Sequence, residues 1–130
     1  MKIGISGAQS VGKTTLLNAL RSEKMFRDLP VRNEVTRRVM SYGLPINEGG
    51  GNTTQRLIMQ EHIVNVFMND NFITDRTALD GVVYSKYLHE NGQIDDDTML
   101  FATDVFVKLQ PKYSVQFYII DRKSTRLNSS

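Results

Sequence analysis

The sequence contains no cysteine, so its 130 residues form no disulfide framework and offer no thiolate metal site. It also has no apolar run long enough to cross a membrane, and its N-terminus lacks the charged-then-apolar layout of a secretory signal peptide. Apolar residues make up 40% of the chain and charged residues 23%, which is ordinary for a folded domain. We therefore expect one cytoplasmic domain without a membrane segment.

Without its last ten residues, the chain also has no excess of basic over acidic residues. The chain has 16 basic and 14 acidic residues, and residues 121–130 (DRKSTRLNSS) hold three of the former and one of the latter. Removing them leaves 13 of each, so no global basic field points to nucleic acid as a partner. These ten residues resemble a translated sequencing adapter. We expect a non-native tail rather than a disordered terminus, and a natural protein that continues beyond Ile120.

Short apolar runs alternate along the chain with segments of helical periodicity. Glycine-rich residues 43–54 predict a loop, and Leu79, Val83 and Tyr87 are expected to mark the apolar face of one helix. Alternating strands and helices favour a single α/β domain over residues 1–120, with a parallel sheet covered by helices on both faces. The expected strands are residues 2–6, 29–35, 71–75 and 113–120, and the expected helices begin near 14 and cover 36–41, 54–69, 79–87 and 101–109.

The nine residues GAQSVGKTT fit the P-loop pattern G-x-x-x-x-G-K-T, between an expected strand and an expected helix. Glycines let backbone N–H groups curl around a phosphate, and the helix N-terminus adds its positive dipole end. Lys13 then places a cation on the β- and γ-phosphates and should be open to ligand, while Thr14 offers a hydroxyl to Mg²⁺. The pattern predicts a three-layer P-loop NTPase fold that binds ATP and Mg²⁺. The expected cofactor-binding residues are Gly7, Ala8, Gln9, Ser10, Val11, Gly12, Lys13, Thr14 and Thr15.

A second polar cluster follows the expected strand at 71–75. Asp75 ends that strand, and a carboxylate at the carboxyl edge of an open α/β sheet is well placed to hold Mg²⁺ beside a P-loop. Arg76 comes next and is expected to contact the transferred phosphate or its acceptor. Asp80 lies three residues after Thr77, a spacing typical of a helix cap. We therefore expect Thr14 and Asp75 as the metal ligands and Asp80 as a cap.

Glu34 after the second strand and Asp-Arg-Thr at 75–77 after the third resemble the nucleoside and nucleotide kinases. Residues 33–38 (NEVTRR) lack the proline that follows the glutamate in deoxynucleoside and thymidylate kinases. The pattern E-x-x-R at Glu34 and Arg37, with Gln60 on a later helix, is more similar to the kinase domain of ribosylnicotinamide kinases and their P-loop ATPase relatives. The resemblance implies catalytic roles for Lys13, Glu34, Asp75 and Arg76, and acceptor binding by Glu34, Arg37 and Arg76.

These features together favour ATP-dependent phosphoryl transfer to a small nucleoside-like or nucleotide acceptor. A P-loop ATPase that drives or regulates a partner explains the P-loop equally well. A GTPase switch is disfavoured because Asn-Lys-x-Asp, and Asp-x-x-Gly after the third strand, do not occur at their expected positions in residues 1–120. A polynucleotide 5′-kinase is disfavoured by the balanced charge.

Four other features have a structural interpretation beside a functional one. Arg37 and Arg38 are equally compatible with a solvated pair and with a phosphate clamp. His62 has no second histidine or cysteine at ligand spacing, so a solvated side chain is expected. Tyr84 is expected in the core or against a base, and residues 95–97 (DDD) are expected to open and cap a helix.

Overall fold

The computed structural model describes residues 1–7, 11–33, 35–45 and 50–120. Its strands form one sheet in the order β2-β3-β1-β4, and every pairing is parallel, which confirms the predicted α/β fold. The second strand is much shorter than the expected 29–35. The four strands are β1 (Lys2–Gly7), β2 (Val31–Arg32), β3 (Phe72–Asp75) and β4 (Val115–Ile119).

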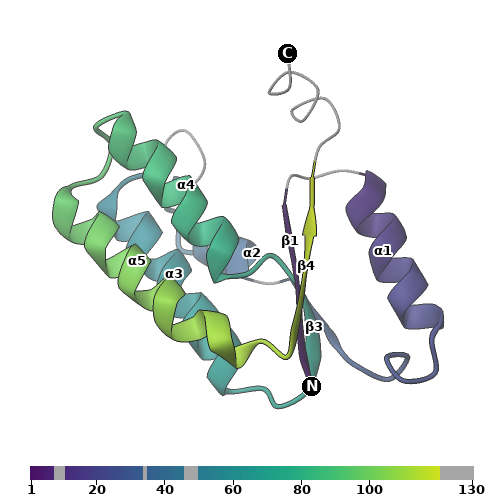
Figure 1. Cartoon of the computed structure of the whole chain (residues 1–130). Coiled ribbons are helices and arrows are strands. Elements are labelled where there is room, and N and C mark those ends of the chain that lie inside the picture. Colours follow the sequence, from purple (N-terminus) through teal and green to yellow (C-terminus); the bar gives the residue numbers. More distant parts are fainter. Residues whose placement is uncertain (8–10, 34, 46–49, 121–130) are drawn as a thin grey trace.

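The helices are α1 (Val11–Ser22), α2 (Val35–Met40), α3 (Asn52–Phe67), α4 (Ala78–Glu90) and α5 (Asp96–Leu109), with a 3₁₀ turn at Gln110–Lys112. They cover both faces of the sheet, as expected (Figure 1). Helix α1 lies on one face, whereas α3, α4 and α5 pack against one another on the other face, and α2 packs against α3. Helix α3 begins at Asn52, inside the expected loop, and residues 46–49 of that loop lie outside the described part.

Strand β1 shows how the two layers meet the sheet. Ile3 and Ile5 point into the cluster beneath α1, whereas Gly4 and Ser6 lie next to Thr77 at the start of α4. Ser6 Oγ lies 2.6 Å from Thr77 Oγ1 at the start of α4. A Cβ at Gly4 would lie 2.6 Å from Thr77 Cγ2, so glycine is what allows α4 to begin so close to the strand. The start of α4 is therefore held against the carboxyl half of β1.

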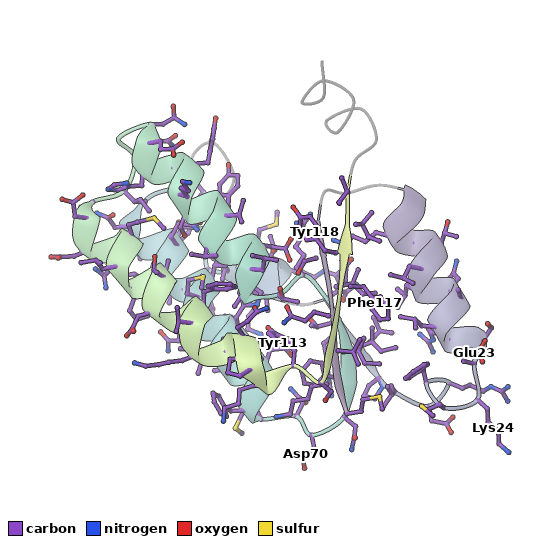
Figure 2. All side chains as sticks on the ribbon, in the orientation of Figure 1. Glu23, Lys24, Asp70, Tyr113, Phe117 and Tyr118 are labelled. Atoms are coloured by element: carbon purple, nitrogen blue, oxygen red, sulfur yellow. The ribbon has the colours of Figure 1, made fainter. Side chains whose placement is uncertain are left out.

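Strand β4 separates its side chains in the same way (Figure 2). Phe117 packs into the cluster under α1, whereas Tyr118 leaves the strand on the opposite side and is 61% exposed. The strand is an edge of the described sheet.

Helix α4 corrects one prediction. Of the expected apolar face, Val83 and Tyr87 are exposed and Leu79 is half-buried. The buried residues are instead small, apart from one leucine, because α4 packs very close to α3: a Cβ at Gly81 would lie 2.5 Å from Met59 Sδ. Val83 and Tyr87 consequently lie on the exposed side of the helix. The buried residues of α4 are Ala78, Gly81, Ser85 and Leu88.

Candidate functional site

The carboxyl ends of β1 and β3 lie side by side, with Ile5 opposite Asp75. Strand β1 ends at Gly7, which has φ = +124°, and a Cβ there would lie 2.3 Å from the carbonyl oxygen of Ile119. Both the backbone angle and the contact require glycine, as the phosphate-loop pattern predicts. Helix α1 follows at Val11, with Gly12 exposed in its first turn. The predicted phosphate-binding residues Ala8, Gln9 and Ser10 lie outside the described residues.

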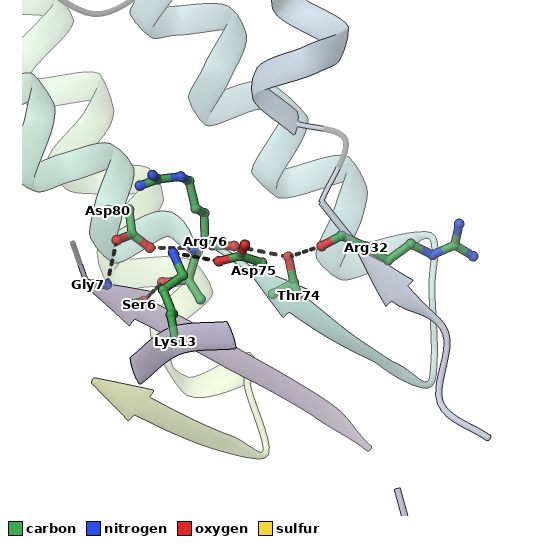
Figure 3. A network of polar contacts seen from close by, with 9 residues as sticks. Ser6, Gly7, Lys13, Arg32, Thr74, Asp75, Arg76 and Asp80 are labelled. Carbon is green, nitrogen blue, oxygen red and sulfur yellow. Dashed lines mark hydrogen bonds and ion pairs between the residues drawn. The ribbon is translucent and has the colours of Figure 1, made fainter. Parts of the chain in front are cut away.

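Lys13 and Asp75 form an ion pair at this edge (Figure 3), with 2.5 Å between Nζ and Oδ1. The Lys13 side chain is only 6% exposed, which corrects the expectation that it is open to ligand. Neither atom makes a well-directed hydrogen bond within the described part of the chain. A nearly buried ammonium with three donors and one carboxylate neighbour has capacity for further oxygen ligands, so this position suits phosphate oxygens.

The hydroxyl-bearing residues next to Lys13 face outward. Thr14 and Thr15 are both exposed in the first turn of α1. Thr14 thus has a free approach for a cation, as its predicted role requires. The described residues contain no group of three or more His, Cys, Asp or Glu side chains that could hold a metal ion. The assignment of Thr14 and Asp75 as Mg²⁺ ligands therefore stays a prediction. Phosphate or water oxygens would have to complete the coordination shell.

Asp80 forms the predicted helix cap and a second contact besides. Its Oδ2 accepts a hydrogen bond from the Thr77 backbone N–H at 2.7 Å, completing a capping box with the Thr77 side chain. Its Oδ1 accepts one from the Gly7 backbone N–H at 2.9 Å (Figure 3). One carboxylate therefore joins the end of β1 to the start of α4. The cap was readable from the spacing, but the contact with Gly7 depends on tertiary packing.

Arg76 occupies a strained turn at the tip of β3. It has φ = +88°, and non-glycine residues in this region cost about 1–3 kcal/mol. Its N–H donates to the Ile5 carbonyl at 2.8 Å, which holds the turn against β1. Thr74 Oγ1 lies 3.1 Å from the Arg32 carbonyl oxygen and 3.0 Å from that of Arg76, and accepts from Asn65 Nδ2 at 3.2 Å. A conformation this constrained places the Arg76 side chain at the wall of a cleft.

The cleft has a volume of about 930 Å³ and lies beside the Lys13–Asp75 pair, between the strand tips and helices α2, α3 and α4. Gly7, Asp75, Arg76 and Asp80 line it on the side of the sheet. Its size is in the range of small-molecule sites. Its other walls include apolar and aromatic side chains, among them Met40, Ile58, Leu79, Val83, Tyr84 and Tyr118.

The two arginines of α2 have different surroundings. Arg37 lines the cleft. Arg38 Nη1 lies 2.5 Å from Glu61 Oε2, outside the cleft, in an ion pair between α2 and α3. Glu34 lies outside the described residues, although its neighbours Asn33 and Val35 both line the cleft.

His62 is buried at 3% exposure in the floor of the cleft, and the expectation of a solvated side chain is wrong. Burial lowers the pKa of its imidazole to about 4, with Asp80 opposing the shift and Arg76 adding to it. Its Nδ1 has no hydrogen-bond partner within the described ranges, and leaving a buried polar group unpaired costs about 1–3 kcal/mol. Gln55 also lines the cleft, whereas Gln60, the glutamine in the resemblance, is exposed. No sequence pattern distinguished these positions.

A comparison with protein families agrees with this geometry. The family model of an AAA domain matches residues 2–119. The chain belongs to that family. No curated protein matches the chain. As an AAA domain it is a P-loop NTPase that binds nucleotide, which accounts for the glycine-ended first strand, the lysine in the first turn of α1 and the acidic tip of β3. No helix among the described residues has both the length and the apolar character to span a membrane.

Proposed function

We propose that this AAA domain binds ATP with Mg²⁺ and transfers the γ-phosphoryl group to a small nucleoside-like or nucleotide acceptor in the cleft. The observation that carries the proposal is the position of the cleft. It adjoins the Lys13–Asp75 pair, and two arginines without a carboxylate partner among the described residues, Arg37 and Arg76, line it. A hydrolase needs room only for water beside the γ-phosphate, whereas about 930 Å³ accommodates an organic acceptor.

The residues of the P-loop and of the β3 tip would have separate roles in phosphoryl transfer. Gly7 to Thr15 would hold the phosphates, Lys13 would neutralise charge on the β- and γ-oxygens, and Thr14 with Asp75 would hold Mg²⁺. When bound, Mg²⁺ and ATP supply charge neutralisation and the transferred group. In the reaction, a bond forms between an acceptor oxygen and the γ-phosphorus while the bond from that phosphorus to the bridging oxygen breaks, and ADP leaves.

The cleft side chains would act on the acceptor. Arg76 and Arg37 present guanidinium groups that match phosphate or a developing negative charge. Glu34 would orient the acceptor and would take its proton if the acceptor group is a hydroxyl. Positioning and charge neutralisation are most of what this chemistry needs, and these residues would supply both.

The test is a transfer assay with ATP labelled in its γ-phosphoryl group. Nucleosides, nucleoside monophosphates and ribosylnicotinamide are offered as acceptors, after a thermal-shift screen in the presence of a non-hydrolysable ATP analogue. We expect at least one acceptor to raise the melting temperature and to become labelled. ATP hydrolysis that no acceptor changes, without a labelled product, would contradict the proposal. That result would favour the alternative of an ATPase module that drives or regulates a partner, which membership in the AAA family supports as well.

A further inference from the structure

His62 combines three properties that a purely structural histidine does not need. It lies on α3 with 3% exposure, and yet it lines the cleft. Its ring packs beside the α4 backbone at Gly81, where a Cβ would lie 3.5 Å from His62 Cδ2. In the part of the chain that the structure describes, its Nδ1 has no hydrogen-bond partner. Buried polar groups are rarely left in this state unless a ligand or water completes them.

The other α3 residues that line the cleft, Gln55 and Ile58, are uncharged. Gln55, two turns before His62 on α3, donates its side-chain amide to Ser85 Oγ at 2.8 Å. Ile58 and Tyr84 add apolar and aromatic surface. Arg37 and Arg76 also line the cleft and provide positive charge, and their part of the lining is its cationic end. The cleft lining thus combines these cations with neutral and apolar side chains, and one of its side chains, His62, has a buried Nδ1 without a hydrogen-bond partner among the described residues.

We infer that His62 is a specificity-determining residue whose Nδ1 hydrogen-bonds the heterocyclic base of the acceptor. This inference rests on the proposed function, since it takes the cationic end of the cleft as the place of phosphoryl transfer. A base has flat apolar faces and a few uncharged polar atoms on its edge, which matches the floor. A sugar phosphate without a base would leave both the apolar wall and Nδ1 without a partner.

The protonation state of the imidazole agrees with a neutral partner. Its pKa, lowered to about 4 by burial, leaves the ring uncharged near neutral pH, with one nitrogen as donor and the other as acceptor. Of the charged groups that face it, Asp80 is occupied by two backbone N–H groups, and Arg76 is on the cationic side. His62 therefore offers a directional hydrogen bond without attracting a charged ligand.

The experiment compares the 130-residue chain with its His62→Leu and His62→Asn variants. Leucine removes the polar atom, and asparagine restores a polar group near the position of Nδ1. His89→Leu is the matched control, because the other histidine of the chain pairs with Asp96 at 2.7 Å, outside the cleft. The probes are the common nucleosides and nucleoside monophosphates, ribosylnicotinamide, and ribose 5-phosphate as the probe without a base.

We expect a base-containing probe to bind the unaltered chain, and His62→Leu to weaken that binding at least tenfold. His62→Asn is expected to recover part of the loss, His89→Leu to cause none, and ribose 5-phosphate to bind all four proteins alike. The melting temperature of ligand-free His62→Leu should not fall, because the substitution removes an unpaired buried group. A purely structural histidine would instead lower the melting temperature and leave base affinity unchanged.

Three outcomes would overturn the inference: equal affinity of His62→Leu for the base-containing probe, an equal loss for ribose 5-phosphate, or no binding of any base-containing probe to the unaltered chain. A non-hydrolysable ATP analogue is titrated against each protein in parallel. Failure of the unaltered chain to bind that analogue or to transfer phosphate would defeat the proposed function. Equilibrium binding of the probes needs no phosphoryl transfer. It therefore measures separately whether substitution of His62 changes the preference for base-containing probes.

Discussion

The two faces of the sheet are built from different kinds of side chain. Under α1 the buried members of the cluster are all aliphatic, and Phe26 and Phe117 pack against them partly buried. On the face of α3, α4 and α5 an apolar cluster is accompanied by buried polar side chains, several of which are hydrogen-bonded in pairs. The aliphatic cluster consists of Ile3, Ile5, Leu20 and Ile73, and the buried polar residues of the other face include Ser6, Gln55, His62, Asn65, Thr74, Thr77 and Ser85.

The two kinds of side chain have different roles: the aliphatic cluster holds α1 against the sheet, and the polar side chains orient the groups that surround the cleft. Aliphatic packing is non-directional, so the α1 face fixes where the helix lies without fixing individual polar atoms. Hydrogen bonds are directional, and on the other face they orient the groups that surround the cleft, such as Thr74 beneath the Arg76 turn. Substitutions within the aliphatic cluster should therefore change stability, whereas substitutions of polar side chains that would contact nucleotide or acceptor should change binding or catalysis. The following predictions test that separation.

The largest effect on stability is expected for Ile5→Ala. Ile5 is 1% exposed in the α1 cluster, and truncating a buried isoleucine lowers the free energy of unfolding by about 2–5 kcal/mol. Denaturant unfolding measures the change, and nucleotide affinity of the folded protein should stay within about twofold. Ile120→Ala, at a site 64% exposed, is the control and should change stability by less than about 0.5 kcal/mol. A loss of acceptor affinity without a loss of stability would contradict the division between the faces.

The next prediction concerns the catalytic rate after substitution of Lys13. Lys13→Ala should lower kcat about 10²–10³-fold, as expected when one charge-stabilising group at a transition state is removed. The melting temperature should change little, because Asp75 is 39% exposed and water can solvate it once its partner is gone. Lys108→Ala is the control, since it breaks an exposed i,i+4 pair with Asp104. Near-normal turnover of Lys13→Ala would contradict the assignment of the P-loop.

The features of this site that depend on neighbouring residues could be predicted from the sequence, and those that depend on tertiary packing could not. The P-loop pattern, the strand-to-helix order and the capping box at Thr77 and Asp80 each lie within a few consecutive residues, where backbone conformation and spacing determine the result. The positions of α1 and β3 followed from the same local patterns. The sequence was enough to predict these elements because their conformation depends on neighbouring residues rather than on distant ones.

Contacts between distant segments decided the rest. Periodicity placed Val83 on the apolar face of a helix, but α3 approaches α4 at Gly81 and the Val83 side chain is exposed. The same packing buries His62 in the cleft, although a single histidine on a helix looks solvated by sequence criteria. Similarly, nothing in the sequence distinguishes Gln55 in the cleft from the exposed Gln60. A residue pattern gives the period of a helix but not which neighbour approaches it most closely.

The two aspartates near the tip of β3 sharpen the comparison further. Asp75→Asn should lower Mg²⁺-dependent turnover about a hundredfold, since it removes the charge next to Lys13 and the predicted metal site. Asp80→Asn should instead lower the free energy of unfolding by about 1–2 kcal/mol, because an amide has one oxygen to replace two that accept N–H groups of Gly7 and Thr77. Turnover at several Mg²⁺ concentrations and denaturant unfolding measure the two effects. A larger loss of turnover at Asp80 would reverse the assignment.

The smallest effect distinguishes adjacent arginines on α2. Arg37 lines the cleft, so Arg37→Gln should raise the acceptor KM about tenfold, or about 1.4 kcal/mol, while the ATP KM stays unchanged. Arg38 pairs with Glu61 through a side chain that is 46% exposed, and such pairs contribute about 0–1 kcal/mol to stability. Arg38→Gln should therefore leave both KM values within about twofold. Steady-state kinetics on the acceptor found by the labelling screen provide the measurement. Equal changes for the two variants would indicate that the charge of α2 as a whole, rather than contact of Arg37 with the acceptor, determines binding at this wall of the cleft.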